Sequence, residues 1–402
     1  MALLSVEEAL LRVLDAVEAM APEPVHVAAA GGRTLALPLA AILTQPPFDA
    51  AVMDGYAVRA ADVATLPATL RVIGEAAAGH PFAGRVGAGE AVRISTGAPV
   101  PGDANLVVMQ ENVARDGACI VMQAGTQEAG GNVRATGDDF RAGETLLLPG
   151  RRLGAREIAL AAAMGHATLP VRRRPQVAVL ATGDELVPPG ERPGPGQIVA
   201  SNHLGVGALA EAAGAEVAQI GIARDTEADL ARRLAEGEGA DILVTIGGAS
   251  VGDHDLVGPV LERRGLALGF WKIAMQPGKP LRFGRLGSLR VLGLPGSPVS
   301  SLICARLFLV PLIHALLGRP AEAARPLEAR LAVALEANGE RQQYMRARSR
   351  RAADGGLLVA PVRTQDSSYL SPLAEADCLL VRPPHAPPAA AGTAVQILPI
   401  DF

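Results

Sequence analysis

The feature that most constrains the fold is the alternation of buried strands and helices between residues 175 and 318. The apolar runs "QVAVLATG", "EVAQIGIARD", "DILVTIGG" and "LRVLGLPG" are each followed by a helical segment, for example "NHLGVGALAEAAG" after the first and "DHDLVGPVLERRG" after the third. The runs lack the alternation of polar and apolar residues that marks a strand with one exposed face. They therefore predict a parallel sheet covered by helices on both faces, which is a three-layer α/β domain.

The segments on either side of this domain have a different pattern. Ser5 and Glu8 form a capping-box pair at the start of a helix expected over residues 5–20. Short runs rich in Val and Ile between about residues 43 and 136 are punctuated by Gly and Pro, which predicts a small all-β domain. A similar pattern of short apolar runs over 327–402 predicts a second β region, after a linker-like segment at 319–326. Since 402 residues exceed what one hydrophobic core supports, several modules are expected.

Charge and hydropathy exclude two classes of partner. The formal net charge of −4 leaves no broad basic surface for nucleic acid. The most apolar stretch, "SLICARLFLVPLIHALLG", contains Arg306, Pro311 and His314, which predicts a core helix rather than a membrane span. The first twenty residues lack the basic start and the small-residue cleavage site of a signal peptide. We therefore expect a cytoplasmic protein with neither a nucleic-acid nor a membrane partner.

The ends of the predicted strands carry the residues that indicate a ligand site. In an open α/β sheet, ligands bind beyond the carboxyl ends of the strands. Five such segments are polar and contain Gly, Pro or Asp: "TGDEL" (182–186), "ARDT" (223–226), "GGASVGDHD" (247–255), "QPGKP" (276–280) and "PGSPVSS" (295–301). Backbone N–H groups in such turns bind anions, and Glu185, Asp225 and Asp255 would hold a hard divalent cation, Mg²⁺. Together they predict a site for a phosphorylated or nucleotide-bearing ligand.

Two lysines add to this prediction. All but two of the 37 basic residues are arginine, and the exceptions, Lys272 and Lys279, both lie in "FWKIAMQPGKP". A lysine ammonium is a compact point charge that suits a contact with phosphate. A chance placement within an arginine-rich composition is the alternative.

A hydrolase motif competes for one of these segments. Residues 248–252 match G-x-S-x-G, the turn that carries the nucleophilic serine in α/β hydrolases. That turn needs a helix directly after the serine and, further along, an acid and a histidine. Here the loop continues through Asp253, His254 and Asp255, and His314 lies within an apolar helix, so the hydrolase interpretation is disfavoured.

Taken in order, these segments resemble the molybdopterin molybdenumtransferase (MoeA) family. "PPFDAAVMDGYAV" (46–58) and "ISTGAPVPGDANLVVMQE" (94–111) are similar to two signatures of its N-terminal half. "TGDEL", "GGASVGDHD", "FWKIAMQPGKP" and "GLPGSPVSS" are similar to its catalytic domain, and "QYMRARSR" with "SSYLSPLAEADCLLV" to its C-terminal domain. The resemblance spans nearly the whole chain.

The resemblance implies a multidomain α/β plus β fold. Its parts would be a three-layer, molybdopterin-binding, MogA-like catalytic domain over residues 170–320 and a C-terminal β-barrel-like domain over 321–402. Two β-containing modules would precede them: a small β domain at 43–136, and a linking module made of 21–42 and 137–169. The helix within residues 1–20 would pack on the α/β domain. The family also implies a homodimer with its active site at the subunit interface.

The implied activity is the insertion of molybdenum from molybdate into adenylylated molybdopterin with release of AMP, which completes molybdenum cofactor biosynthesis. The chain would be a transferase that depends on Mg²⁺, with molybdate and adenylylated molybdopterin as substrates. Because the dithiolene sulfurs bind the molybdenum, the protein mainly needs to position two anions and neutralise them. Molybdopterin adenylyltransferase and molybdoenzyme-maturation proteins would be its partners.

Site residues carry over to this sequence where the motifs match. Asp54 and Thr96 would face the partner subunit's α/β domain, and Asp225, Asp255, Lys272 and Lys279 would complete the catalytic set. The metal ligands would be Glu185, Asp225 and Asp255. Arg346 and Ser367 match positions implicated in oxyanion binding. The remaining pterin-nucleotide contacts would be Gly183, Gly247, Gly248, Ser250, Gly252, Pro295, Gly296, Ser297 and Ser300.

The chain departs from the family pattern at several positions. Gln276 stands where the family usually has Lys, and Asp366 where it usually has Gly. Ala50 and Ala51 replace an Asn-Ser pair, and Ser297 replaces an Asn. These changes fall near the expected molybdate subsite. They motivate an alternative function, that of a molybdopterin-binding carrier or chaperone without metal-insertion turnover.

Overall fold

The computed structural model describes residues 3–248, 256–321 and 326–400. Its internal contacts divide the chain into two compact units. The α/β–barrel unit comprises Met1–Glu23, Gly32–Ala36 and Val171–Phe402, and the N-terminal β unit comprises Pro24–Gly31 and Leu37–Pro170. The α/β–barrel unit is thus built from both ends of the chain.

A six-stranded sheet in the order β16-β13-β17-β21-β20-β18 forms the centre of the α/β part. Four neighbouring strands are parallel, and they are the four predicted from apolar runs: β13 (Gln176–Thr182), β16 (Glu216–Ala223), β17 (Ile242–Ile246) and β21 (Leu289–Leu294). The sheet is mixed rather than wholly parallel, because β20 (Arg282–Leu286) and β18 (Ala267–Trp271) add an antiparallel edge. Only two residues connect β20 to β21, and a parallel pair needs a much longer crossover.

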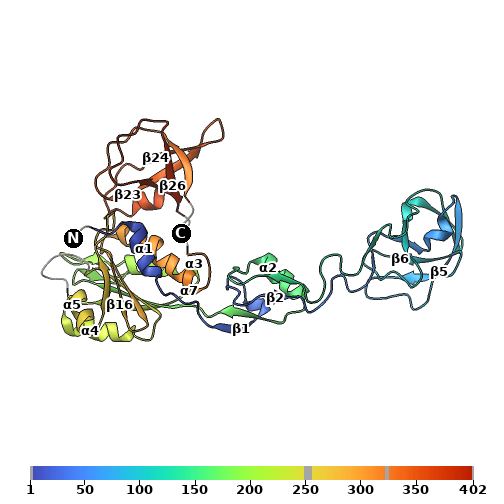
Figure 1. Cartoon of the computed structure of the whole chain (residues 1–402), viewed down its shortest axis with the longest axis horizontal. Coiled ribbons are helices and arrows are strands. Elements are labelled where there is room, and N and C mark those ends of the chain that lie inside the picture. Colours follow the sequence, from blue (N-terminus) through green and yellow to red (C-terminus); the bar gives the residue numbers. More distant parts are fainter. Residues whose placement is uncertain (1–2, 249–255, 322–325, 401–402) are drawn as a thin grey trace. The chain divides into compact units, whose positions relative to one another are not determined.

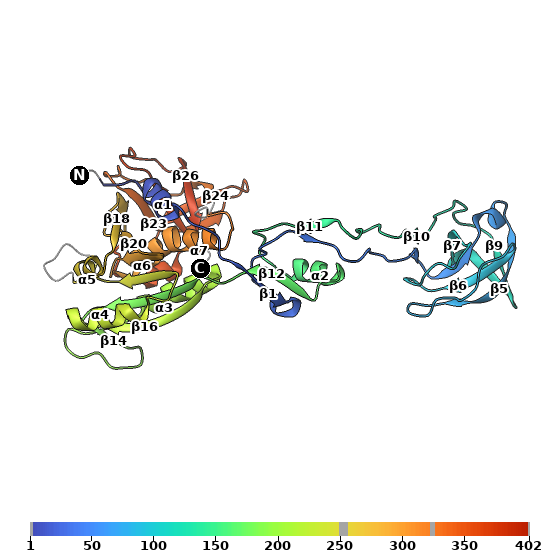
Figure 2. The same cartoon turned by 60° about the horizontal axis from the view of Figure 1, so that its bottom comes forward.

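Helices cover both faces of this sheet, as Figures 1 and 2 show. One face packs against α3 (Asn202–Ala213), α6 (Pro298–Cys304), α7 (Val310–Leu316) and the N-terminal α1 (Val6–Leu14). The other face packs against α4 (Glu227–Glu236) and α5 (Val257–Arg263). The predicted three-layer α/β arrangement is confirmed.

Helix α1 is shorter than the predicted helix over residues 5–20. Its capping box is present, with the Glu8 N–H donating to Ser5 Oγ and the Ser5 N–H donating to the Glu8 carboxylate. The helix ends at Leu14 because Asp15 is extended and Ala16 has a φ of 48°, in the left-handed region. The apolar periodicity continues past this point, so no residue in the segment predicts that the helix ends at Leu14.

The most apolar stretch is a core helix, as predicted. Pro298–Leu316 is long and apolar enough to cross a membrane, but 83% of its most apolar 18 residues are buried inside the structure. A π-helical turn at Ala305–Leu309 joins α6 to α7 and precedes Pro311. The ring and the missing N–H of proline disfavour a regular α-helix at that point.

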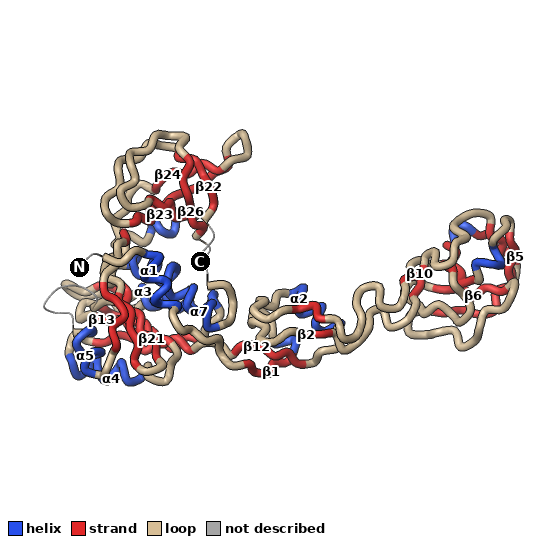
Figure 3. Tube along the Cα trace, viewed as in Figure 1, coloured by secondary structure: helices blue, strands red, loops and turns tan. Residues whose placement is uncertain are grey.

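The C-terminal part is a closed barrel of five strands, most of which are labelled in Figure 3. Strands β23 (Gln342–Arg351), β24 (Leu357–Pro361), β22 (Leu327–Leu331), β26 (Ala394–Pro399) and β25 (Cys378–Arg382) pair in this order, and β25 pairs back with β23. The short β19 (Met275–Gln276) adds to β23 in parallel and so ties the barrel to the α/β part. A one-turn helix, α8 (Ser371–Glu375), precedes β25. The predicted β-barrel-like domain is confirmed.

The N-terminal β unit contains the two predicted β-containing modules. One holds a six-stranded sheet: β7 (Leu106–Met109), β4 (Gly55–Val58), β6 (Glu90–Ile94), β5 (Ala68–Ala76), β9 (Cys119–Met122) and β8 (Val113–Asp116). The pair β3 (Ala50–Ala51) with β10 (Val133–Arg134) belongs to the same module, because Ala51 and Val133 pack in the core of that sheet. The other module contains α2 (Ala155–Ala163) and the pair β2 (Leu39–Ala40) with β11 (Thr145–Leu147). The pair β1 (Pro22–His26) with β12 (Thr168–Arg172) includes residues of both units.

Candidate functional site

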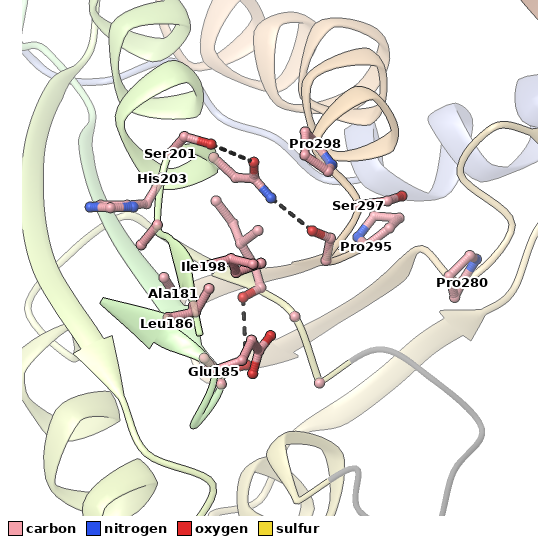
Figure 4. Close-up of a pocket in the computed structure, with 18 of the residues that line it drawn as sticks. Ala181, Glu185, Leu186, Ile198, Ser201, His203, Pro280, Pro295, Ser297 and Pro298 are labelled. Carbon is pink, nitrogen blue, oxygen red and sulfur yellow. Dashed lines mark hydrogen bonds between the residues drawn. The ribbon is translucent and has the colours of Figure 1, made fainter. Parts of the chain in front are cut away.

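A large cavity opens at the carboxyl ends of the parallel strands. In this sheet β13 lies between β16 and β17. The connection from β13 runs to one side, to β16, and the connection from β16 crosses back to the other side, to β17. Ligands bind in the crevice at such a topological switch point. The cavity has a volume of about 750 Å³ and is lined by Ala181 and Thr182 of β13 and by Ile246 of β17. We call it the switch-point cavity (Figure 4).

All five predicted strand-end segments reach this cavity. The predicted site residues that line it are Gly183, Glu185, Asp225, Gly247, Gly248, Lys272, Lys279, Pro295, Gly296 and Ser297. Ser250, Gly252 and Asp255 lie outside the described residues. The structure thus brings the described members of the set to one place, while their individual roles stay predictions.

Glycine is required at the end of β17. Gly247 has a φ of +98°, in the left-handed region, and a Cβ there would lie 2.7 Å from the carbonyl oxygen of Thr182. A side chain would therefore strain the backbone and push apart β13 and β17. The strand ends in bare backbone because two strand ends meet closely at the floor of the cavity.

Reciprocal hydrogen bonds hold two of the acidic loops together. The Asp184 N–H donates to Asp225 Oδ2 at 3.3 Å, and the Asp225 N–H donates to Asp184 Oδ1 at 3.2 Å. Arg224 Nη1 donates to the carbonyl oxygens of Asp184 and Leu186 at 3.0 and 3.3 Å. The loops after β13 and β16 therefore form one supported rim for the cavity.

Two carboxylates on this rim suit a hard cation. Glu185 and Asp225 both line the cavity, and Figure 4 shows Glu185 across it from Ser201. Among residues 3–248, 256–321 and 326–400, no three His, Cys, Asp or Glu side chains cluster as a metal site. Mg²⁺ commonly takes only one or two carboxylates and fills the rest of its shell with water and substrate phosphate. The described residues fit such a cation.

The residues on the cavity wall opposite these carboxylates were not predicted from the sequence. Ser201 Oγ donates to Asn202 Oδ1 at 3.3 Å, and Asn202 Nδ2 donates to the Gly296 carbonyl at 2.7 Å (Figure 4). Ile198 and Val199 of β15 (Ile198–Val199), which pairs with β14 (Leu186–Val187), also line the cavity with exposed apolar side chains. An Asn at a helix start suggests only a cap, so nothing in the local sequence distinguished it.

The two lysines lie at the ends of one loop. The Lys272 N–H donates to the Leu281 carbonyl, and the Ile273 N–H donates to the Lys279 carbonyl, each at 3.0 Å. Lys272 Nζ lies 4.1 Å from the centroid of the Trp271 ring, a cation–π contact, and its backbone φ is 69°. Both lysines line the switch-point cavity.

A second, smaller cavity adjoins the first on the barrel side. It has a volume of about 330 Å³ and shares Lys279, Pro280, Pro295 and Ser297 with the switch-point cavity. We call it the barrel-side cavity. Its other lining residues include three predicted ones, Ser300, Arg346 and Ser367, and four polar residues that are Gln276, Arg341, Gln343 and Gln365.

Buried contacts fix the predicted residues of the barrel-side cavity. Arg346 is 1% exposed, and its Nη1 donates to the Tyr369 carbonyl at 3.0 Å. Burial lowers the pKa of Arg346. The Val299 N–H donates to the Ser367 carbonyl at 3.0 Å, which ties the barrel loop to the start of α6. Ser297 Oγ donates to Ser300 Oγ at 2.7 Å.

The two departures from the family pattern have different surroundings. Gln276 lines the barrel-side cavity and pairs with Gln343 in the β19–β23 ladder, so two neutral amides stand side by side. The Asp366 carboxylate accepts the Ser368 N–H at 2.9 Å, and Asp366 is not among the described residues that line the cavity. Gln276 is therefore the departure that lines the cavity. Asp366 acts on the cavity through Arg346, whose pKa is lowered by burial and raised in part by the Asp366 charge.

The N-terminal β unit brings Asp54 and Thr96 together. The N–H and Oγ–H of Thr96 donate to Asp54 Oδ1 at 2.7 and 2.8 Å. These two bonds lower the pKa of Asp54. A Cβ on Gly55 would lie 1.9 Å from the Val108 carbonyl, so only glycine lets β4 approach β7 here. The expected position of Asp54 and Thr96 opposite a partner's α/β domain stays a prediction.

Comparison with known proteins covers nearly the whole chain. Three family models match in succession: "MoeA N-terminal region (domain I and II)" over residues 4–165, "Probable molybdopterin binding domain" over 178–315, and "MoeA C-terminal region (domain IV)" over 328–400. A molybdopterin molybdenumtransferase from Haemophilus influenzae is 34% identical over 381 residues, 94% of each chain. Molybdopterin molybdenumtransferase 2 from Mycobacterium tuberculosis is 35% identical over 98% of each chain. A solved molybdopterin biosynthesis MoeA protein from Pyrococcus horikoshii superposes with a TM-score of 0.86 at 32% identity, covering 100% of both chains.

Proposed function

Because this chain belongs to the molybdopterin molybdenumtransferase (MoeA) family, we propose that it inserts molybdenum from molybdate into adenylylated molybdopterin, releasing AMP and completing molybdenum cofactor biosynthesis. The observation that carries this proposal is the pair of adjoining cavities that share Lys279 and Ser297. One is large enough for a pterin nucleotide. The other is small, polar and bordered by Arg346, which suits an oxyanion.

The residues of the switch-point cavity suit a ligand with a planar ring and phosphates. Ile198 and Val199 offer apolar surface to a ring, while Asn202 and the backbone around Gly247 offer polar contacts. Lys272 and Lys279 would bind the phosphates at the other end. The ring and the phosphates would thereby be held in one orientation relative to the neighbouring oxyanion.

Magnesium is part of the proposal. Glu185 and Asp225 would hold Mg²⁺ on the rim of the switch-point cavity, with Asp255 as the third predicted ligand. When bound, the cation supplies positive charge that neutralises the phosphoanhydride. The Asp184–Asp225 backbone bonds keep the rim in place before any ligand arrives, so little reorganisation is needed at the reaction.

The reaction places growing negative charge where this chain has cations. Attack of water on the phosphoanhydride forms a new P–O bond as the bond to AMP breaks, so AMP leaves and the pterin keeps its own phosphate. Lys272 and Lys279 would stabilise the negative charge on the separating phosphates. The molybdate oxyanion would bind beside Lys279 and Arg346 in the barrel-side cavity, within reach of the pterin dithiolene. The protein thus acts by positioning and electrostatics, because the dithiolene sulfurs bind the metal themselves.

Molybdate-dependent release of AMP tests the function directly. The purified protein is given adenylylated molybdopterin and Mg²⁺, with or without molybdate, and AMP is quantified by chromatography. AMP that appears only with molybdate supports metal insertion. Gln276 and Asp366 motivate the alternative of a molybdopterin-binding carrier or chaperone. A protein that binds the adenylylated pterin yet releases no AMP would have that role instead.

We also propose a homodimer in which each active site draws on both subunits. Asp54 and Thr96 would come from one subunit, and the switch-point cavity from the other. A mixture of Asp54→Ala and Lys279→Met subunits, co-expressed and purified through two different tags, should regain AMP release, because one of its two sites lacks both substitutions. Either variant alone should be inactive. Absence of recovery in the mixed dimer would contradict the shared site.

The setting of the reaction follows from its chemistry. We expect a cytoplasmic reaction in which molybdopterin adenylyltransferase supplies the substrate and molybdoenzyme-maturation proteins receive the product. Co-purification with either partner from cell extract checks this expectation.

A further inference from the structure

Lys272 has a backbone conformation that residues other than glycine rarely adopt. Its φ of 69° lies in the left-handed region, where a side chain costs energy unless the surrounding structure compensates. Backbone hydrogen bonds on both sides fix this conformation, because the Lys272 N–H donates to the Leu281 carbonyl and the Ile273 N–H donates to the Lys279 carbonyl. Strained residues of this kind cluster at functional sites, which indicates that the direction of the Lys272 side chain matters.

The left-handed conformation interrupts the alternation of side chains at the end of β18. Successive side chains of a strand point to opposite faces, so regular alternation would put Phe270 and Lys272 on one face. Trp271 and Ile273 would lie on the other face. In the structure Phe270 and Ile273 instead pack in the same hydrophobic core. The conformation of Lys272 therefore keeps its half-buried side chain out of that core and leaves it beside Trp271, which is 37% exposed.

The Trp271 ring holds the Lys272 ammonium. Lys272 Nζ lies 4.1 Å from the ring centroid, within the range at which the negative face of an indole attracts a cation. Among the residues that the structure describes, no carboxylate forms a salt bridge with Lys272. A neutral ring attracts the ammonium without cancelling its charge, whereas a carboxylate would cancel it. The positive charge of Lys272 therefore stays available to an anion in the switch-point cavity, which this lysine lines.

A second cation fixes the ring itself. Arg282 lies directly opposite Trp271 in the antiparallel β18–β20 pair, and the side chains of such a pair are neighbours on one face of the sheet. The guanidinium carbon of Arg282 lies 5.5 Å from the ring centroid, and Arg282 is only 7% exposed. A Cβ on Gly258 of α5 would lie 2.5 Å from Arg282 Nη1, so the guanidinium is packed against that helix. Because Arg282 is held in this way, its contact also limits the movement of the indole.

We propose that Trp271 is a positioning residue, which holds the Lys272 ammonium in place for a phosphate in the switch-point cavity. Fixing a free lysine side chain at the moment of binding costs rotamer entropy, and the ring contact removes part of that cost beforehand. The contact is kept when the phosphate binds, since an ammonium can face the ring on one side and the anion on the other. Trp271 is not among the described residues that line the cavity, so it acts through Lys272. The inference rests on the proposed function for the role of Lys272 as a phosphate contact.

The composition allows the contact to be measured directly in the full-length protein. Trp271 is the only tryptophan of the chain, and Lys272 and Lys279 are its only lysines. Lysine labelled with ¹³C at Cε should give two NMR signals, and the Lys272→Arg variant identifies one of them by its loss. The ring current of Trp271 should shift the Lys272 ε-protons upfield of those of Lys279. This shift should disappear in Trp271→Leu and remain in part in Trp271→Phe.

Equilibrium binding of adenylylated molybdopterin, with Mg²⁺ but without molybdate, tests what the contact does. Trp271→Leu should weaken binding about two- to fivefold, as expected for loss of a cation–π contact, and Trp271→Phe should weaken it less. In a Lys272→Met background Trp271→Leu should cause no further loss, because the ring then has no ammonium to hold. Leu268→Ala shortens another exposed apolar side chain of β18 and should leave binding unchanged.

Three outcomes would overturn the proposal. The first is that the Lys272 ε-protons have the same shift in the wild type and in Trp271→Leu. The second is that Trp271→Leu does not weaken binding. The third is that it weakens binding equally with and without Lys272→Met, since the ring would then act through the fold alone. If thermal unfolding shows that Trp271→Leu is not native, Trp271→Phe carries the same comparisons.

The same measurements separate this inference from the proposed function. A wild-type protein that binds the adenylylated pterin without releasing AMP would contradict the proposed function alone, and the comparison of the Trp271 variants would still decide the positioning role. A wild-type protein that does not bind the adenylylated pterin would contradict both.

Discussion

At the scale of single residues, Asp54 shows how local donors set the charge state of a site residue. Two bonds from Thr96 favour its carboxylate and lower its pKa. The stabilisation they give is present above the pKa that Asp54 has in the unfolded chain. It is lost as the pH falls through the lower pKa of the folded state.

Thr96→Val should therefore raise the pKa of Asp54 towards its ordinary value, because one of the two donors is removed. A pH titration of ¹³C-labelled aspartate carboxyls measures this. Asp49 is a matched internal control, since Thr136 donates to it through N–H and Oγ–H in the same way and lowers its pKa. A Thr96→Val protein in which Asp54 keeps its low pKa would show that the backbone N–H alone sets it.

A substitution at Gln276 tests directly which residues bind the molybdate oxyanion. Gln276→Lys adds an ammonium to the barrel-side cavity beside Lys279, so molybdate should bind about tenfold or more tightly, as expected for a hydrogen bond to a charged group. Titration calorimetry with molybdate measures the affinity. Gln123→Lys adds the same charge in the N-terminal β unit and serves as the control. Equal affinity in the wild type and Gln276→Lys would remove this position from the oxyanion site.

Glu185 should matter for the metal rather than for the fold. Glu185→Gln is expected to raise the Mg²⁺ concentration needed for half-maximal AMP release about tenfold or more, by analogy with the loss of groups around other metal sites. Thermal unfolding should stay unchanged, because no described hydrogen bond of the fold uses its carboxylate. Glu191→Gln, at an exposed position just after β14, is the control. A Mg²⁺ dependence identical to the wild type would exclude Glu185 from the metal site.

At the scale of secondary-structure elements, α2 depends on one carboxylate. Glu157 accepts the Gly154 N–H at 2.9 Å and bonds from Arg151 Nε and Nη2 at 3.1 and 2.5 Å. Together these lower the pKa of Glu157 from 4.5 to about 2, with the Arg151 bond as the largest cause. The carboxylate both caps the first turn and pairs with a cation.

Glu157→Gln should consequently destabilise the N-terminal β unit near neutral pH. The difference from the wild type should be full above about pH 4.5 and shrink as the pH falls towards about 2, where the wild-type carboxyl is itself protonated. Thermal unfolding followed by circular dichroism at a series of pH values measures it. A difference that stays constant down to pH 2 would mean that packing, not charge, is responsible.

Periodicity predicts elements well where a segment is buried on both faces. The four parallel strands were visible as apolar runs, and the polar residues at their ends correctly indicated one edge of the sheet. The antiparallel edge strands β18 and β20 and the two-residue β19 were not predicted, because their pairing follows from short connections and distant partners. The role of Asn202 in the cavity wall was not predicted for the same reason, because its hydrogen bond to Gly296 joins residues 94 positions apart in the chain.

At the scale of the whole molecule, each unit has hydrophobic cores of its own. Phe308 is fully buried in the core of the α/β–barrel unit, whereas residues such as Ile120 and Met122 form a core of the N-terminal β unit. A multidomain chain of this kind need not unfold in one two-state step. The composition showed that several modules were needed but not which distant segments would share a core.

Phe308→Ala should therefore act on one unit only. Calorimetry of the full-length protein should show the transition of the α/β–barrel unit destabilised by about 3–5 kcal/mol, the usual cost of a phenylalanine-sized core truncation, with the other transition unchanged. At neutral pH the Glu157→Gln variant should do the opposite: the transition of the N-terminal β unit is destabilised, and that of the α/β–barrel unit is unchanged. A single transition that moves as one in both variants would show that the units unfold together.

The packing of α1 on α7 has a consequence during synthesis. α1 ends at Leu14 and α7 begins at Val310, so the first helix leaves the ribosome long before its partner exists. At typical elongation rates of about 5–20 residues per second, this delay lasts roughly 15–60 s. Throughout it, an amphipathic segment stays uncovered in the nascent polypeptide, where a chaperone could shield it, while the inserted N-terminal β unit has all of its own residues and can fold first.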